Sequence, residues 1–166
     1  MPNLQWSEAL VLGLPMMDDT HREFVELLAQ AENAADDALA GQWRTLVEHT
    51  DEHFSREDRW MLDTRFSSTN CHSVQHKVVL QVMREGLQMA GAGDFMSLRH
   101  MAKELALWFP QHAQTMDAAL ALHLRGIGYD PVTGVMSMPQ ALPKDTIQGC
   151  GSLSCSPGRP ALEPSA

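Results

Sequence analysis

The sequence has few cysteines, few aromatic residues, few basic residues and no long apolar run. Its three cysteines (Cys71, Cys150 and Cys155) do not make a disulfide framework, so we expect a protein of the reducing cytoplasm. The 12 lysines and arginines stand against 21 acidic residues, and the net charge of −9 argues against nucleic acid or an anionic membrane as a partner. No segment reaches the roughly 18 apolar residues of a membrane span, and residues 1–17 lack the basic start of a secretory signal.

The apolar residues that are present recur at helical spacing, and strand-like alternation is missing. Hydrophobic residues make up 44% of the 166-residue chain, which is enough for the core of one domain. Their periodicity predicts helices over about residues 18–40, 42–63, 70–90 and 95–125. Asp18 or Asp19 is expected to cap the first helix and Asp94 the fourth, while Gly41 separates the first two. Four helices joined by short loops indicate an all-α fold, an up-down-up-down antiparallel four-helix bundle.

Two segments flank the predicted bundle of residues 18–125. Residues 1–17 carry scattered apolar side chains broken by Gly13 and Pro15, and we expect an N-terminal arm that packs on the bundle. Residues 126–166 hold six of the nine prolines and six of the eleven glycines, which predicts a mostly disordered tail. The core side of the third helix is expected to carry Val74, Val78, Val82 and Met89.

Histidines and carboxylates recur at spacings that suit a metal site. His53 precedes Glu57 by four residues, and His72 precedes His76 by four. On a helix such pairs share one face, about 6 Å apart along the axis. The other two predicted helices add further donors. The candidate ligands are His21, His53, Glu57, His72, His76, His112 and Asp117.

The number of candidate ligands predicts two metal ions. Seven side chains are too many for one tetrahedral zinc or one facial-triad iron. Two octahedral ions offer twelve positions, of which five imidazoles, two bridging carboxylates and one shared oxo or hydroxo group would fill eleven. The remaining position would accept a small molecule such as dioxygen. A set rich in imidazole and without thiolate suits iron, although zinc, manganese and copper remain open.

The fourth predicted helix contains two irregular features. Pro110 removes a helical hydrogen bond and clashes with the carbonyl of Ala106. His112 and Asp117 are five residues apart, which an ideal helix would place roughly 140° from one another. A π-type widening would align them, so we expect an irregular turn between Ala106 and Asp117. Outside this pattern lie His49, His100, His123 and Cys71, which are not expected to be ligands.

In order and spacing, these residues resemble the hemerythrin family, in its bacterial branch, the bacteriohemerythrins. The matching pattern reads His21, His53-x-x-x-Glu57, His72-x-x-x-His76 and His112-x-x-x-x-Asp117. The segment Met17-Asp18-Asp19-Thr20-His21 and the pair Trp108-Phe109 before His112 also match. The resemblance covers about residues 4–125 and stops at the tail.

The resemblance implies a bundle that holds two iron ions with a bridging oxo or hydroxo group and binds dioxygen reversibly. It implies that His72, His76 and His112 hold one iron. It implies that His21 and His53 hold the other, which keeps the open position, and that Glu57 and Asp117 bridge the two. By the same resemblance, Trp108 and Phe109 line an apolar oxygen pocket.

The expected function is therefore that of a non-haem di-iron protein that carries, stores or delivers dioxygen and is not an enzyme. The alternative is an oxygen or redox sensor that uses the same site and signals to an unidentified protein partner through the tail. A ferritin-like oxidase is disfavoured because no glutamate has a histidine three residues later. A di-zinc hydrolase would need a polar cleft and a general base, which the apolar pair Trp108-Phe109 argues against.

Overall fold

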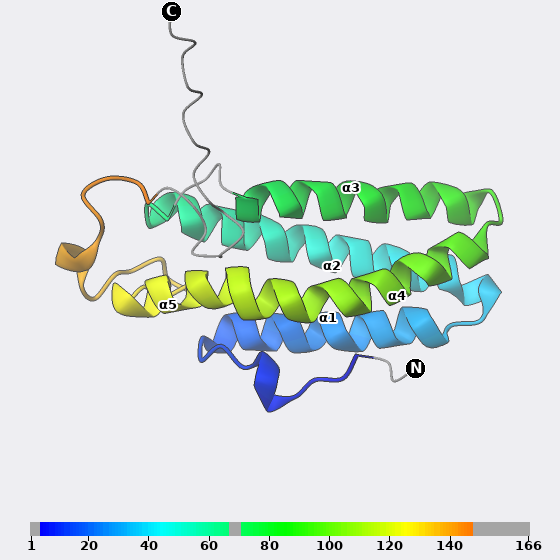
Figure 1. Ribbon diagram of the computed structural model, residues 1–166, viewed down its shortest axis with the longest axis horizontal. Coiled ribbons are helices and arrows are strands. Elements are labelled where there is room, and N and C mark those ends of the chain that lie inside the picture. The colour runs from blue at the N-terminus through cyan, green and yellow to red at the C-terminus, as the bar shows by residue number, and fades with distance from the viewer. Residues whose placement is uncertain (1–3, 67–70, 148–166) are drawn as a thin grey trace, which may run out of the picture.

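The four long helices lie side by side along one axis (Figure 1) in a computed structural model that describes residues 4–66 and 71–147. They are α1 (Pro15–Asn33), α2 (Asp36–Asp63), α3 (Cys71–Gly91) and α4 (Phe95–His112). A π-helical turn, η2 (Ala113–Asp117), joins α4 to α5 (Ala118–Gly126), so that these three elements form one continuous run. Each helix packs on its neighbours in sequence, and α1 also packs on α4. The expected up-down-up-down four-helix bundle is confirmed.

The boundary between the first two helices lies at an earlier residue than the sequence suggested. α1 ends at Asn33 and α2 already begins at Asp36, so Gly41 lies inside α2 and does not separate the two helices. α1 begins at Pro15, whose fixed φ suits a first helical position. The prediction that Asp18 or Asp19 caps this helix is wrong, because both lie inside α1. The carboxylate of Asp18 instead accepts the N–H groups of Leu12 (2.7 Å) and Gly13 (3.0 Å) and so ties the arm to the bundle. Asp94 caps α4 as expected, through the N–H of Ser97 (3.1 Å).

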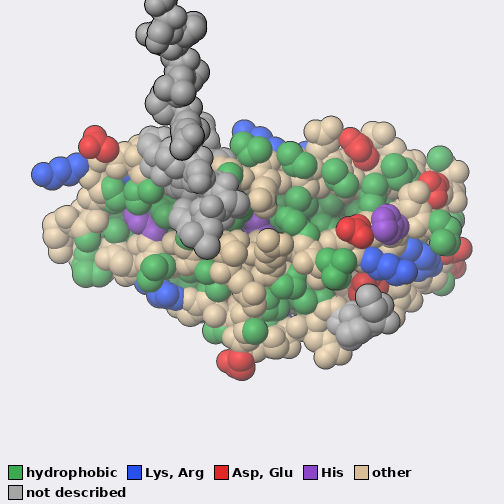
Figure 2. All heavy atoms as spheres, viewed as in Figure 1, with side chains coloured by type: hydrophobic (Ala, Val, Ile, Leu, Met, Phe, Trp, Pro, Cys, Tyr) green, Lys and Arg blue, Asp and Glu red, His purple; other side chains and the backbone are tan. Residues whose placement is uncertain are grey.

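The predicted core side of α3 is wrong, because the valines face solvent. Val74, Val78 and Val82 are 53%, 55% and 43% exposed. Hydrophobic side chains are accordingly visible on the surface over α3 and α4 (Figure 2). The buried face of α3 is offset from the valines and consists of His72, Ser73, His76, Leu80, Met83, Gly86 and Ala90.

Close packing of α3 against α2 and α4 depends on a glycine and a tryptophan. A Cβ at Gly86 would lie 2.9 Å from both Leu98 Cδ1 and Trp43 Nε1, so no larger residue fits without a shift. The buried indole of Trp43 donates its N–H to the carbonyl of Met83 (2.8 Å). These contacts join α2, α3 and α4 closely at this level of the bundle.

The segments on either side of the bundle pack against it. In the arm, a 3₁₀ turn, η1 (Glu8–Leu10), buries Leu10. Beyond α5, Ile127 and Tyr129 are buried, Tyr129 pairs with Met136 in an antiparallel bridge, and a second 3₁₀ turn, η3 (Pro139–Ala141), follows. The expected disorder therefore does not hold for residues 126–147. Residues 148–166, which include Cys150 and Cys155, lie outside the described residues.

The apolar core consists of two clusters with a polar layer between them. The larger cluster includes Phe24, Leu28, Trp43, Leu46, Leu98 and Phe109. The smaller one includes Met17, Trp60, Met61, Leu120, Leu124 and Tyr129. Along α1, α2 and the α4–α5 run, the buried histidines and acids fall between the two sets. Within the described ranges, no helix is both long and apolar enough to cross a bilayer.

Candidate metal centre

All seven predicted ligand residues meet in the polar layer. None is more than 2% exposed, although free imidazoles and carboxylates are rarely buried so completely. Every helix of the bundle contributes, because the i, i+4 spacings place each pair on the inner face of its helix. The residues are His21 (α1), His53 and Glu57 (α2), His72 and His76 (α3), His112 (α4) and Asp117 (η2).

The seven residues form two groups that share both carboxylates. In each group, one potential ligand atom per residue lies within 4.8 Å of all the others. The first group comprises Glu57, His72, His76, His112 and Asp117. The second comprises His21, His53, Glu57 and Asp117. The cluster therefore consists of two overlapping groups, one with three imidazoles and one with two.

Glu57 presents a different oxygen to each group. Its Oε1 lies 3.0 Å from Nε2 of His53 and 3.9 Å from Nε2 of His21. Its Oε2 lies 3.5 Å from Nε2 of His72 and 3.4 Å from Nε2 of His76. A carboxylate placed in this way can bridge two ions.

Asp117 divides its oxygens in the same manner. Its Oδ2 lies 3.2 Å from Nε2 of His21. Its Oδ1 lies 2.9 Å from Nε2 of His72 and 3.1 Å from Nε2 of His112. The two carboxylates thus repeat one pattern, with one oxygen toward each group.

The cluster fits metal ions because its inward atoms have no other partner. Within the described residues, Glu57 Oε2, both Asp117 oxygens and Nε2 of His21, His72, His76 and His112 form no hydrogen bond, although nitrogen and oxygen lie close together. Buried polar atoms without partners are costly. Their lone pairs converge on common points between the side chains, where cations would satisfy them. A donor set of imidazole and carboxylate, without thiolate, fits iron, zinc or manganese.

The charges within the cluster shift several pKa values of the metal-free chain. Burial would raise the pKa of the Glu57 and Asp117 carboxyls, but the surrounding imidazoles hold both pKa values well below their usual ranges. Burial would likewise lower the pKa of His72, yet Asp117 and Glu57 together raise it to about 10. Burial dominates at His53 and lowers its pKa. Both carboxylates are therefore ionised and ready to bind cations.

Two further residues contact the outer nitrogens of the histidines and were not identified from the sequence. Asp58 Oδ1 lies 2.9 Å from Nδ1 of His76, and Gln75 Oε1 lies 3.2 Å from Nδ1 of His112. Asp58 was missed because it directly follows Glu57 and so turns away from the inner face of α2. The contact arises only because α3 packs beside that helix.

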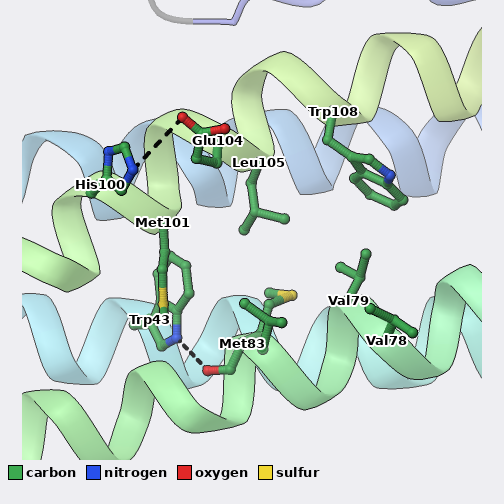
Figure 3. A pocket seen from close by; sticks show the side chains of 10 residues that line it. Trp43, Val78, Val79, Met83, His100, Met101, Glu104, Leu105 and Trp108 are labelled. Atoms are coloured by element: carbon green, nitrogen blue, oxygen red, sulfur yellow. Dashed lines mark hydrogen bonds and ion pairs between the residues drawn. The ribbon is translucent and has the colours of Figure 1, made fainter.

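The structure places Trp108 and Phe109 on different sides of the cluster. Phe109 is buried, stacks on Phe24 (ring centroids 4.4 Å apart) and presents its edge to His21 (5.2 Å, 90°). Trp108 stacks on His112 instead (4.4 Å, 28°). Trp108 also lines an apolar groove of about 260 Å³ between α3 and α4 (Figure 3). Phe109 alone of the pair contacts the two-histidine group.

The irregular turn expected before Asp117 is present as η2. Its π-helical widening brings His112 and Asp117, five residues apart, to within 3.1 Å. Pro110 lies within α4 immediately before it. His49, His100 and His123 lie outside both groups, as expected. Cys71 is also absent from them, but it is disulfide-bonded, which the sequence did not predict.

A four-helix bundle with a buried cluster of histidines around two shared carboxylates defines a metal-binding bundle protein. Residues 12–123 match the family described as Hemerythrin HHE cation binding domain. The chain belongs to the hemerythrin family.

Curated relatives agree with this assignment. A bacteriohemerythrin of Ralstonia nicotianae is 35% identical over 130 residues, covering 78% of this chain and 95% of the relative. A bacteriohemerythrin of Pseudomonas aeruginosa is 25% identical, covering 71% and 79%. The myohemerythrin of Sipunculus nudus is 27% identical, covering 68% and 86%. No solved structure gives a significant match.

Proposed function

We propose that this protein holds two iron ions in the cluster and binds dioxygen reversibly, as a carrier, store or delivery protein and not as an enzyme. The observation that carries the proposal is the division of the carboxylate oxygens. Glu57 and Asp117 each direct one oxygen to the three-histidine group and the other to the two-histidine group. Residues arranged to hold a single ion would not need two centres that share the same two carboxylates.

The donor set indicates which residues would hold each ion. His72, His76 and His112 would hold one, His21 and His53 would hold the other, and Glu57 and Asp117 would contribute to both. A pair of ferrous ions would supply the electrons that reversible binding of dioxygen requires. The group with two imidazoles has fewer protein donors, so the small molecule is expected there.

The surroundings of the two-histidine group suit an apolar ligand. Phe109 lies edge-on to His21 and is itself backed by Phe24, and both phenylalanines are only 1% exposed. Such a wall excludes water, and with it the protons that would promote irreversible oxidation of the site. These residues therefore favour a site that releases its ligand over one that consumes it.

Anaerobic reduction of the iron-loaded protein, followed by cycles of oxygen exposure and removal, tests the proposal by visible absorption. A band that appears with oxygen and disappears on its removal over repeated cycles is expected. Rapid, irreversible oxidation would contradict reversible binding and favour an oxidase or a redox sensor. Carrier and oxygen sensor share this binding step and differ in whether a protein partner responds to it.

Measuring the iron content of variants tests whether Glu57 contributes to both metal positions. Glu57→Ala is expected to lose iron from both positions, because Glu57 belongs to both groups. Glu52→Ala, an exposed glutamate on the same helix, serves as the matched control and should keep the full iron content. Equal iron content in the two variants would exclude the bridging role.

A further inference from the structure

We propose that the two metal positions fill in a fixed order, the three-histidine position first, because Asp58 and Gln75 orient two of its ligands in advance. This inference rests on the proposed function, since it assumes that the cluster holds two ions. Asp58 and Gln75 are positioning residues, because they contact the outer nitrogens of the histidines and not the positions of the ions.

His76 is held from two directions. Asp58 Oδ1 lies 2.9 Å from its Nδ1. An ionised carboxylate can only accept a hydrogen bond, so Nδ1 carries a proton and Nε2 is the nitrogen that faces Glu57 Oε2 (3.4 Å) and the position of the ion. The ring of Phe54 stacks almost parallel on the imidazole, with centroids 3.9 Å apart and an angle of 6°. Both the tautomer and the orientation of the ring are thereby fixed before an ion arrives.

His112 is held by the same combination of contacts. Gln75 Oε1 lies 3.2 Å from its Nδ1, so this nitrogen donates, and Nε2 faces Asp117 Oδ1 (3.1 Å). The indole of Trp108 stacks on the imidazole of His112, with ring centroids 4.4 Å apart and an angle of 28°. Two of the three histidines of this group therefore have a hydrogen-bonded outer nitrogen and a stacked ring.

The two-histidine group lacks such support. Among the residues that the structure describes, Nδ1 of His21 and Nδ1 of His53 have no hydrogen-bond partner, and the same is true of His72. The rings of His21 and His53 are tilted against each other at 57°, and Phe109 meets His21 only with its edge. The outer nitrogens of these imidazoles are therefore not held in place, and within the described part of the chain their only hydrogen bond to a side chain is the one between His53 Nε2 and Glu57 Oε1 (3.0 Å), on the inner side.

This difference predicts unequal affinities. A hydrogen bond to the outer nitrogen of a ligating histidine typically contributes about ten- to hundredfold to metal affinity. The three-histidine position has two such bonds and one more imidazole, whereas the two-histidine position has neither advantage. The first ion should therefore occupy the three-histidine position, and a chain with a single ion should accumulate when metal is limiting.

Native mass spectrometry of the full-length, metal-free chain, titrated anaerobically with ferrous iron, counts the ions per chain. With one equivalent added, the singly loaded chain is expected to exceed both the empty and the doubly loaded chain. His53→Ala should still accumulate the singly loaded chain and lose less affinity at the first step than His76→Ala, which should lose this tight binding step. If the doubly loaded chain dominates at one equivalent, or if the two variants lose the same affinity for the first ion, this inference fails while the proposed function stands. Failure of the unaltered chain to bind any ion would overturn the proposed function as well.

The positioning role is tested by removing the two outer acceptors. Asp58→Ala and Gln75→Ala are each expected to weaken the first binding step about ten- to hundredfold, and Asp58→Asn, which keeps an acceptor oxygen, should restore part of it. The matched controls are Asp51→Ala and Gln81→Ala, on the same helices, whose side chains contact Arg84 and Glu85 and no ligand histidine. If Asp58→Ala and Gln75→Ala weaken the first binding step no more than the controls do, the two residues have no positioning role.

A spectroscopic signature separates positioning from general stability. In the metal-free chain, ¹⁵N chemical shifts should show a proton on Nδ1 of both His76 and His112. In Asp58→Ala the shift of His76 should change while that of His112 remains. Thermal unfolding by circular dichroism confirms that each variant is folded. Unchanged tautomers in folded Asp58→Ala would contradict the proposal.

Discussion

His112 Nε2 lies 3.1 Å from Asp117 Oδ1, although the two residues are five positions apart along a continuous helical run. The π-helical turn η2 makes this approach possible, because its wider spacing brings residues five apart into register. Pro110 precedes the turn and already lacks one backbone donor. The irregular backbone thus delivers a carboxylate that both groups share.

Replacing Asp117 by asparagine should therefore affect both metal positions. The amide has nearly the same shape but lacks the negative charge, and each group contains Asp117. Iron content is expected to fall from two ions per chain to one or fewer, as measured by elemental analysis. Asp37→Asn, an exposed position in the first turn of α2, should leave it unchanged. Retention of two tightly bound ions by Asp117→Asn would argue against a shared carboxylate.

The pH dependence of the metal-free chain should oppose that of metal binding. The pKa of His72 is raised from 6.5 to about 10, because Asp117 and Glu57 outweigh burial. A raised pKa stabilises the protonated folded form, so this contribution is complete below pH 6.5 and is lost as the pH rises toward about 10. The same proton competes with a cation, so Co²⁺ affinity should increase over this window and binding should release protons. Calorimetry in buffers of different ionisation enthalpy measures the release; uptake without proton release would contradict the assignment.

Phe109→Leu should shorten the lifetime of the oxygenated protein. Phe109 presents its edge to His21, whereas Phe24 stacks behind it without such a contact. Phe24→Leu removes a similar aromatic volume from the same cluster and serves as the control. Absorption after oxygenation should decay several-fold faster in Phe109→Leu than in Phe24→Leu. Equal decay rates would show that the aromatic wall acts only through general packing.

Trp43→Phe should destabilise the fold without affecting metal content. The indole is fully buried and donates to the carbonyl of Met83 (2.8 Å; Figure 3). Loss of this buried hydrogen bond should lower the free energy of unfolding by about 1–3 kcal/mol, as measured by urea denaturation of the metal-free chain. The iron content should remain that of the unaltered protein, because Trp43 lies in the larger apolar cluster outside the polar layer. A loss of iron would instead show that metal binding depends on how α3 packs against Trp43.

The sequence was most informative where local helical geometry decides the outcome. The spacings of His53 with Glu57 and of His72 with His76 place each pair on one face whatever the rest of the fold does. The five-residue spacing before Asp117 likewise predicted the π-helical turn that the structure contains. For these residues, the spacing within a single helix was enough to predict their positions.

Two predictions made for α3 were incompatible, because the ligand histidines and the valines were both expected on its inner face. His72 and Val74 are two residues apart, about 200° around a helix, so they cannot both face the bundle. Since His72 and His76 occupy the inner face, Val74 and Val78 must point outward, as the structure has them. Asp58 and Gln75 could not be assigned in this way, because their contacts depend on how two helices pack and not on spacing within one.

The ligands extend from His21 to Asp117 and come from every helix of the bundle, so bound ions would act as a non-covalent cross-link across most of the chain. They would also lie between two apolar clusters that otherwise meet through a layer of unsatisfied polar atoms. At a free metal concentration a hundredfold above the dissociation constant, each ion adds about 2.7 kcal/mol to the stability of the folded state. Loss of the bound ions would then let the bundle open more often and expose it to proteases.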